Sequence, residues 1–156
     1  MMGATVLIVD DDSALLEALP ETLRLRMRGV TVETADSAAA ALDRIATQDY
    51  DAIVTDIKMP GKDGLVLLTE IRERRPDTPV LMITGHDEHA LAIQALRRGA
   101  FDFIQKPIDR DYFVRSLEEA ILARGLSRRA KDRQLALERC ASELERIVED
   151  RVSSSF

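Results

Sequence analysis

The sequence has very little cysteine, few aromatic residues and no long apolar segment. Cys140 is the single cysteine, so the chain can form no internal disulfide and has no second thiol for a zinc site. No apolar run approaches the roughly 18 residues that a membrane-spanning helix requires. The N-terminus lacks the basic region followed by an apolar region that marks a secretory signal. These absences predict a cytoplasmic protein without a membrane-spanning segment.

Positive charge is also scarce relative to negative charge. The 22 lysines and arginines are outnumbered by 28 acidic residues, which gives a net charge of −6 and argues against a general affinity for nucleic acid. No helix-turn-helix, ATPase loop or kinase motif is evident, so we expect no direct nucleic-acid binding by this chain. A hydrophobic content of 46% over 156 residues indicates one globular domain with a modest extension.

Short apolar runs alternate with helical segments over residues 4–124. Strands are expected at Thr5–Val9 and at 30–34, 52–56, 80–83 and 101–104. Helices are expected after the candidate caps Ser13 and Ser37, after Gly64, over 88–98 and from about 109, and Pro20 is expected to kink or divide the first. Strands that alternate with helices predict an α/β fold, a doubly wound parallel sheet of five strands with five helices.

Polar side chains follow four of these strands at the point where each ends. The carboxyl ends of parallel strands share one edge of the sheet, which is where ligands bind. We therefore expect an acid pair, a further acid, a hydroxyl and a lysine to meet there, namely Asp10, Asp11, Asp56, Thr84 and Lys106.

Three carboxylates at one edge require a counter-charge. Two like charges about 4 Å apart repel by about 4 kcal/mol at an effective dielectric constant near 20. Mg²⁺ accepts oxygen ligands from one or two carboxylates, phosphate groups and water. The cluster of Asp10, Asp11 and Asp56 therefore predicts a magnesium site, and a surface cluster of capping acids is the alternative interpretation.

The order of these motifs resembles the receiver domains of two-component response regulators. The resemblance rests on DDD at residues 10–12, DAIVTDIKMPGKDG at 51–64, TG at 84–85 and KP at 106–107, and it covers about residues 4–124. It implies a CheY-like sheet with strand order 2-1-3-4-5. The segment MITGHDEHALAIQALRRGAFDFIQKP, residues 82–107, is most similar to receivers of nitrogen-regulation and nitrogen-fixation type.

The resemblance implies a role for each acid. Asp56 is expected to accept a phosphoryl group from a sensor histidine kinase. Asp11 would bind Mg²⁺ directly, Asp10 would bind it through water, and Asp56 and the main-chain carbonyl of Lys58 would complete the protein ligands. The chain would not be an enzyme with an external substrate, but a phosphoacceptor that assists its own phosphorylation and dephosphorylation.

The remaining site residues are expected to stabilise the phosphoryl group or to change conformation when it is attached. Lys106, which would precede a cis bond to Pro107, and Thr84 are expected to contact phosphoryl oxygens. Phe103 is expected to move with Thr84 as a switch, and an ordinary core position is the alternative interpretation. Lys58 and His86 lie at positions that set the lifetime of the phosphorylated state in the family, although His86 and nearby His89 also suit an ordinary exposed surface.

Other functions remain open on the sequence alone. The receiver could belong to a hybrid histidine kinase or a phosphorelay protein. A phosphohydrolase of the haloacid dehalogenase type would use Asp10 as its nucleophile, because Asp10 and Asp12 form an Asp-x-Asp motif after the first strand, but no cap insertion is present. A third alternative is an adaptor that uses the fold only as a docking surface.

Residues 125–156 form a charged, proline-free extension that we expect to be helical. Apolar positions spaced by three and four residues run over about two heptads, at Leu137, Cys140, Leu144 and Ile147, until Arg151 ends the pattern. This pattern predicts a coiled-coil linker to an output module that is absent here, or a homodimer contact, whereas a helix that packs on its own domain is the alternative. A homodimer through the face formed by residues 88–98, 101–104 and the following helix is also expected.

Overall fold

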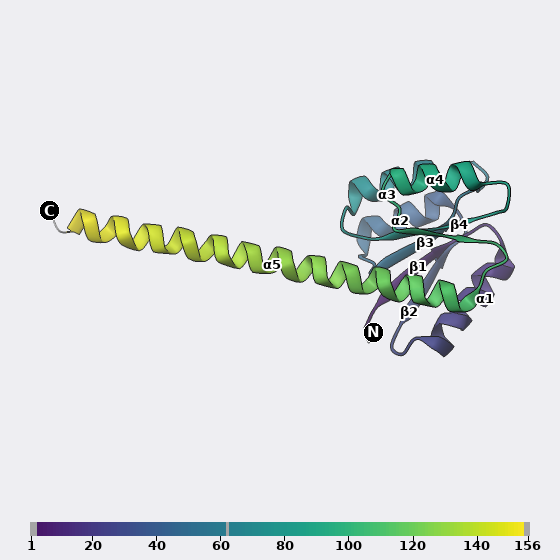
Figure 1. Cartoon of the computed structure of the whole chain (residues 1–156), viewed down its shortest axis with the longest axis horizontal. Helices are drawn as coiled ribbons and strands as arrows, with labels where there is room; N and C mark the ends of the chain where they lie inside the picture. The colour runs from purple at the N-terminus through teal and green to yellow at the C-terminus, as the bar shows by residue number, and fades with distance from the viewer. Residues whose placement is uncertain (1–2, 62, 155–156) are drawn as a thin grey trace. The chain divides into compact units, whose positions relative to one another are not determined.

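The structure is a computed structural model, and it describes residues 3–61 and 63–154. Strands and helices alternate along the chain (Figure 1). The strands are β1 (Thr5–Val9), β2 (Thr31–Ala35), β3 (Ala52–Asp56), β4 (Val80–Thr84) and β5 (Asp102–Gln105). The helices are α1 (Ser13–Arg26), α2 (Ala38–Thr47), α3 (Gly64–Arg74), α4 (His89–Arg97) and α5 (Arg110–Ser154).

The five strands form one parallel sheet in the order β2-β1-β3-β4-β5. The α/β class and this strand order confirm the expected fold. The register pairs Val9 of β1 with Thr55 of β3, so the next residues, Asp10 and Asp56, reach the same edge of the sheet. In this way the topology brings together side chains that are more than forty positions apart in the sequence.

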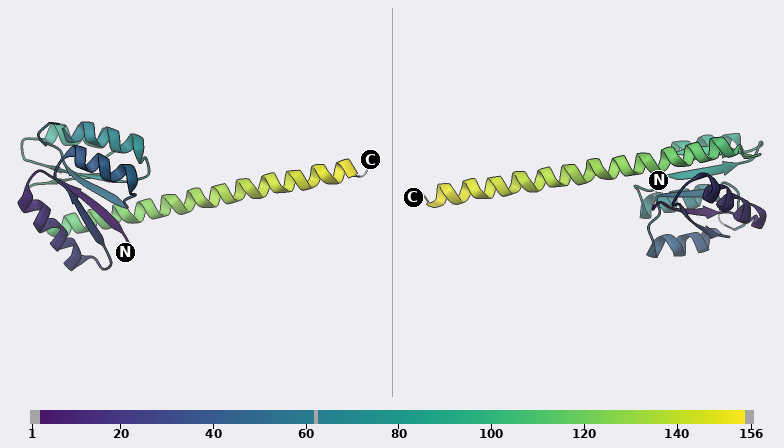
Figure 2. Two further views of the ribbon diagram at one scale, coloured as in Figure 1. Left: turned by 180° about the vertical axis from the view of Figure 1, so that it is seen from behind. Right: turned by 90° about the horizontal axis from the view of Figure 1, so that it is seen from below.

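Helices cover both faces of the sheet, as the two views in Figure 2 show. Because side chains alternate along a strand, Leu7 and Val9 enter the core under α2, α3 and α4, while Val6 and Ile8 enter the core under α1 and the first turns of α5. The strands β3 and β4 are buried along their whole length, which explains their continuous apolar sequence.

Several element boundaries differ from the expected ones. Asp12, not Ser13, caps α1, because its carboxylate accepts a hydrogen bond from the Ala14 N–H at 2.9 Å. Ser37 caps α2 as expected. The second strand begins at Thr31 and the fifth at Asp102, one residue later than predicted in each case, since pairing with the neighbouring strands begins there.

Pro20 does not divide the first helix, so that part of the prediction is wrong. The helix continues through it from Ser13 to Arg26. Leu19, Pro20 and Leu23 are all buried. Their packing on the sheet stabilises the helix on both sides of the proline and offsets the missing N–H donor.

The chain divides into two units, Met1–Arg124 and Gly125–Phe156. Residues 125–154 are helical and belong to α5, while residues 155 and 156 lie outside the described part of the chain. Within that described part, no helix combines the length and the apolar character needed to cross a bilayer.

Arg124 is a buried cation at the end of the first unit. Its side chain is only 3% exposed, and its guanidinium pairs with Asp51 at 2.7 Å and with Asp49 at 2.6 Å. The other oxygen of Asp51 accepts a hydrogen bond from the Thr5 N–H at 2.8 Å. Arg124 therefore ties the receiver part of α5 to the loop before β3 and to the first residue of β1.

Removal of this cation should destabilise the fold. Arg124→Met keeps the apolar stem but leaves two partly buried carboxylates without their counter-ion, and we expect the free energy of unfolding to fall by about 2–3 kcal/mol. Arg97→Met, at an exposed position of α4, should change it by no more than about 0.5 kcal/mol. Urea denaturation of both variants measures the difference, and equal losses would contradict the role assigned to Arg124.

Candidate functional site

The three predicted acids meet at the carboxyl edge of the sheet. Asp10 follows β1 and is fully buried, Asp56 ends β3 and is 7% exposed, and Asp11 is exposed. One carboxylate oxygen from each of them lies within 4.8 Å of the other two. The parallel pairing of β1 with β3 is what places them together.

Only one of the two Asp10 carboxylate oxygens accepts a hydrogen bond from the described residues. Its Oδ1 accepts a hydrogen bond from the Asp12 N–H at 2.9 Å, whereas its buried Oδ2 has no hydrogen-bond partner among the described residues. Burial raises the pKa of Asp10 to about 6, the Asp12 N–H opposes this rise, and the negative charge of Asp56 adds to it. A buried oxygen without a donor, beside two further acids, fits a hard cation with oxygen ligands.

Asp56 lies between a main-chain donor and a side-chain cation. The Lys58 N–H donates to its Oδ1 at 3.3 Å, and the ammonium of Lys106 lies 3.6 Å from its Oδ2. Burial raises the pKa of Asp56, while Lys106 and the Lys58 N–H oppose the rise and Glu88 adds to it. Asp56 is thus a desolvated carboxylate with a positive charge beside it, which is an arrangement suited to a nucleophile.

The end of β4 is bonded directly to the lysine segment. Thr84 is 1% exposed, and its carbonyl accepts a hydrogen bond from the Lys106 N–H at 2.7 Å. Lys106 and Pro107 are joined by a cis peptide bond, as the resemblance implies. Phe103 is half-buried, pairs with Met82 across the sheet and packs against the core under α2, α3 and α4.

Gly64, the first residue of α3, approaches the main chain at the end of β3 closely. A Cβ atom at Gly64 would lie 2.5 Å from the main-chain oxygen of Asp56, so only glycine allows this approach. Asp63 then caps α3 by accepting a hydrogen bond from the Val66 N–H at 2.9 Å. The glycine and the cap together fix the backbone that carries Asp56 and Lys58.

Lys58 and His86 have different surroundings. The Lys58 ammonium lies 3.7 Å from the carboxylate of Glu88. The His86 ring is exposed and lies 3.1 Å from the Gln105 amide. Glu88, which the sequence analysis did not single out, is a buried acid whose carboxylate also accepts a hydrogen bond from the Gly85 N–H at 2.8 Å. A glutamate before a helix gives no sequence signal that separates this role from an exposed cap.

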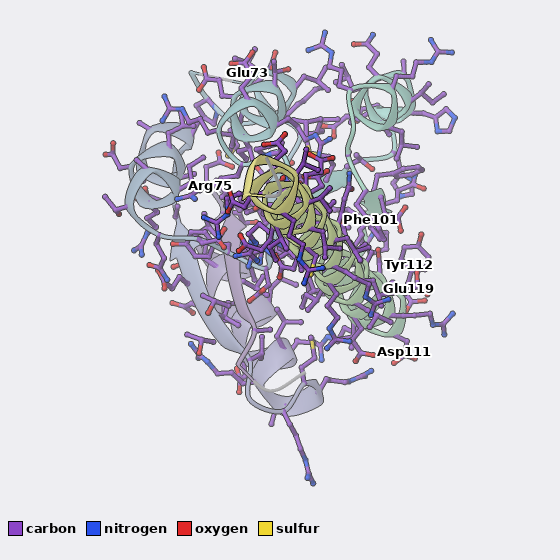
Figure 3. The ribbon with its side chains drawn as sticks, turned by 90° about the vertical axis from the view of Figure 1, so that its left-hand side faces the viewer. Glu73, Arg75, Phe101, Asp111, Tyr112 and Glu119 are labelled. Atoms are coloured by element: carbon purple, nitrogen blue, oxygen red, sulfur yellow. The ribbon has the colours of Figure 1, made fainter. Side chains whose placement is uncertain are left out.

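The face formed by α4, β5 and the start of α5 carries exposed apolar side chains. Its members are Ile93, Leu96, Phe101 and Tyr112, each 39–44% exposed. Tyr112 and Glu119 project from the same side of α5 (Figure 3). The Tyr112 hydroxyl donates to Asp102 at 2.7 Å, and this bond with the acid raises the pKa of Tyr112 to about 12. This surface coincides with the expected switch and dimer face.

The sequence and the fold match known receivers. The family described as "Response regulator receiver domain" matches residues 6–118. The C4-dicarboxylate transport transcriptional regulatory protein DctD of Pseudomonas aeruginosa is 42% identical over 133 residues, which are 85% of this chain and 28% of DctD. The DNA-binding transcriptional regulator NtrC of Escherichia coli strain K12 is 39% identical over 121 residues, 78% of this chain and 25% of NtrC.

Solved structures show the same fold. A response regulator receiver domain protein from Clostridium thermocellum superposes with a TM-score of 0.73 at 31% identity, over 79% of this chain and 98% of that protein. The chain spans only about a quarter of the length of the curated relatives named above. It belongs to the response regulator receiver domains, a family with the CheY-like fold that is phosphorylated by histidine kinases, typically on an aspartate, and that typically binds Mg²⁺ at an acidic pocket.

Proposed function

We propose that this chain accepts a phosphoryl group on Asp56 from a sensor histidine kinase and thereby switches the α4–β5–α5 face to control an output partner. The observation that carries the proposal is the buried carboxylate of Asp56, 3.6 Å from the Lys106 ammonium and beside the unsatisfied oxygen of Asp10. A cytoplasmic location, predicted from the sequence, belongs to the same proposal.

The acid cluster fits Mg²⁺. We propose that Asp11 and Asp56 bind the ion directly, Asp10 through water, and the main-chain carbonyl of Lys58 as a further oxygen ligand. When bound, the ion supplies positive charge to the phosphoryl oxygens. The donor set consists of oxygens alone, which suits Mg²⁺ better than zinc or another soft metal.

The residues of the chain carry out the transfer itself. An Asp56 carboxylate oxygen attacks phosphorus, the bond from phosphorus to the donor histidine breaks, and the histidine nitrogen keeps the electron pair and takes up a proton. The Lys106 ammonium stabilises charge on the transferred group, and the Thr84 hydroxyl donates a hydrogen bond to it. Movement of Thr84 toward the phosphoryl group would free space for Phe103 to turn inward, which favours the second of two arrangements of the α4–β5–α5 face.

The receiver family is not a catalytic family. We propose that the chain assists its own phosphorylation and dephosphorylation through the residues above, and that Lys58 and His86 set the lifetime of the phosphorylated state. A receiver within a hybrid kinase or a phosphorelay protein would use the same chemistry. Among the described residues, the Lys106 ammonium lies 3.6 Å from Asp56, which favours Asp56 over Asp10 as the nucleophile.

Replacement of the acceptor should abolish phosphorylation. With acetyl phosphate and Mg²⁺, intact-mass analysis should show one added phosphoryl group on the wild-type chain, and Asp56→Asn should react at least about 100-fold more slowly because it lacks the attacking oxygen. Asp10→Asn retains Asp56 and should still be labelled, at a reduced rate. Normal labelling of Asp56→Asn with none on Asp10→Asn would instead support the hydrolase alternative.

Magnesium binding should depend on pH through Asp10. Below the folded-state pKa of about 6 the ion competes with a proton, so its affinity should fall by up to about tenfold per pH unit. The stability of the metal-free protein should change with pH in the opposite direction. Because the folded pKa lies above the ordinary value of 3.8, the stabilisation from protonated Asp10 is complete below that value and is lost as the pH rises through about 6.

Thermal melting with and without Mg²⁺ between pH 4.5 and 7.5 measures both effects. Asp10→Asn removes the titrating group and should flatten both pH dependences. Asp87→Asn, at an exposed position outside the cluster, is the matched control and should leave both unchanged. An Mg²⁺ effect that is the same at both ends of this range would contradict the proposed role of Asp10.

We further propose that the extension pairs with a second copy of the chain. Leu137, Leu144 and Ile147 are 66%, 63% and 42% exposed and share one side of the helix with Cys140. A seam of about two heptads is short, so we expect weak association that phosphorylation strengthens through the added contact of the α4–β5–α5 face. The whole relatives named above are transcriptional regulators, and the output of this chain is proposed to lie in a module outside it.

Substitution within the seam should weaken this association. Leu144→Glu places a charge at the centre of the apolar stripe and should raise the dimer dissociation constant by about tenfold or more. Leu135→Glu, on the same helix but outside the stripe, is the matched control with a similar exposed side chain. Sedimentation velocity with and without beryllofluoride measures both, and a wild-type chain that remains monomeric in both states would contradict the proposal.

A further inference from the structure

Glu88 is a buried acid that the proposed phosphoryl chemistry does not use. It lies in the loop between β4 and α4 and is 9% exposed, although its neighbours His86, Asp87 and His89 are exposed. It occupies the N-cap position of α4, yet its side chain makes no capping hydrogen bond to that helix. Its carboxylate instead accepts a hydrogen bond from the Gly85 N–H at 2.8 Å.

Both partners of Glu88 adjoin the phosphoacceptor. Gly85 directly follows Thr84, the hydroxyl residue at the end of β4. Lys58, whose ammonium lies 3.7 Å from the other oxygen of Glu88, also donates its main-chain N–H to Asp56. Glu88 therefore joins the loop after β3 to the loop after β4, and both loops flank Asp56.

The negative charge of Glu88 also acts on Asp56. Lys58 contacts both acids, Glu88 through its ammonium and Asp56 through its main-chain N–H, so negative charge on Glu88 disfavours further negative charge on Asp56. A phosphoryl group adds about 1.5–2 negative charges at neutral pH, so the repulsion grows when Asp56 is phosphorylated. The same group offers new oxygens to the Lys58 ammonium, which then has a stronger partner than Glu88.

We propose that Glu88 is a positioning residue that holds the β4–α4 loop in its unphosphorylated arrangement and is displaced when Asp56 gains the phosphoryl group. Loss of the Gly85 and Lys58 contacts frees the backbone between Thr84 and the first turn of α4. The displacement thus carries the charge at Asp56 to α4 by a route separate from Phe103. This inference rests on Asp56 being the acceptor.

A purely structural role for Glu88 makes a different prediction. If its carboxylate only supports the loop, a neutral isostere that still accepts a hydrogen bond from Gly85 should change stability but not the response to phosphorylation. If its charge opposes phosphorylation, the same isostere should ease the reaction. Glu88→Gln separates the two roles, and Asp87→Asn removes a neighbouring exposed charge as the matched control.

The experiment compares the full wild-type chain with both variants in acetyl phosphate and Mg²⁺. Intact-mass analysis over time should show Glu88→Gln phosphorylated about three- to tenfold faster than wild type, and Asp87→Asn within about twofold of it. In the NMR spectrum, beryllofluoride should shift the Gly85 amide signal of the wild type. In Glu88→Gln without beryllofluoride, the Gly85 amide signal should already lie closer to its position in the beryllofluoride-treated wild type.

Two results would overturn the inference. The first is an equal phosphorylation rate in wild type and Glu88→Gln, and the second is a wild-type Gly85 amide signal that beryllofluoride leaves unchanged while Asp56 is labelled normally. A wild-type chain that acetyl phosphate does not label at Asp56 would instead refute the proposed acceptor, and the inference with it. The two failures are therefore distinguishable.

Discussion

The burial of two acids side by side, Asp10 and Asp56, is the constraint on which the rest of the site depends. Parallel pairing of β1 with β3 forces them to the same edge, and both are almost completely removed from water. Their mutual repulsion is costly in a medium of low dielectric constant unless a proton, a cation or a hydrogen-bond donor offsets it. Lys106 supplies part of that offset, and one Asp10 oxygen, which has no hydrogen-bond partner within the described part of the chain, can accept more.

The loops around the edge connect the two acids to the neighbouring elements. Gly64 lets the loop after β3 approach the backbone of Asp56, and Glu88 links that loop to the end of β4 through Lys58 and Gly85. Each of these contacts involves a charged group or the backbone that carries Asp56. In the proposed switch, a gain of negative charge at Asp56 therefore acts on both loops at once.

Much of the fold could be predicted from the sequence because it depends on local patterns. The apolar runs that end at Asp10, Asp56 and Thr84 mark buried parallel strands. The carboxyl ends of parallel strands lie at one edge of the sheet, which is why the acid cluster could be predicted. The strand order came from the resemblance to receivers, since no periodicity encodes which strands are neighbours. The structure and the family comparison both support that order.

The parts that were missed depend on contacts between distant residues. Pro20 is tolerated in α1 because the residues around it are buried, which its local sequence does not reveal. The residue that caps α1 is Asp12, one position before the predicted Ser13. In the sequence, Glu88 and Arg124 look like ordinary exposed charges. Only tertiary packing shows that Glu88 bridges two loops and that Arg124 is buried between two acids.

The most direct test of the account is to locate the phosphoryl group chemically. Borohydride reduction of the chain, after brief reaction with a phosphorylated histidine kinase, converts an aspartyl phosphate to homoserine, and peptide mass spectrometry then identifies the residue. We expect homoserine at position 56 and at no other aspartate. Homoserine at position 10 or 11, with position 56 unmodified, would contradict this expectation.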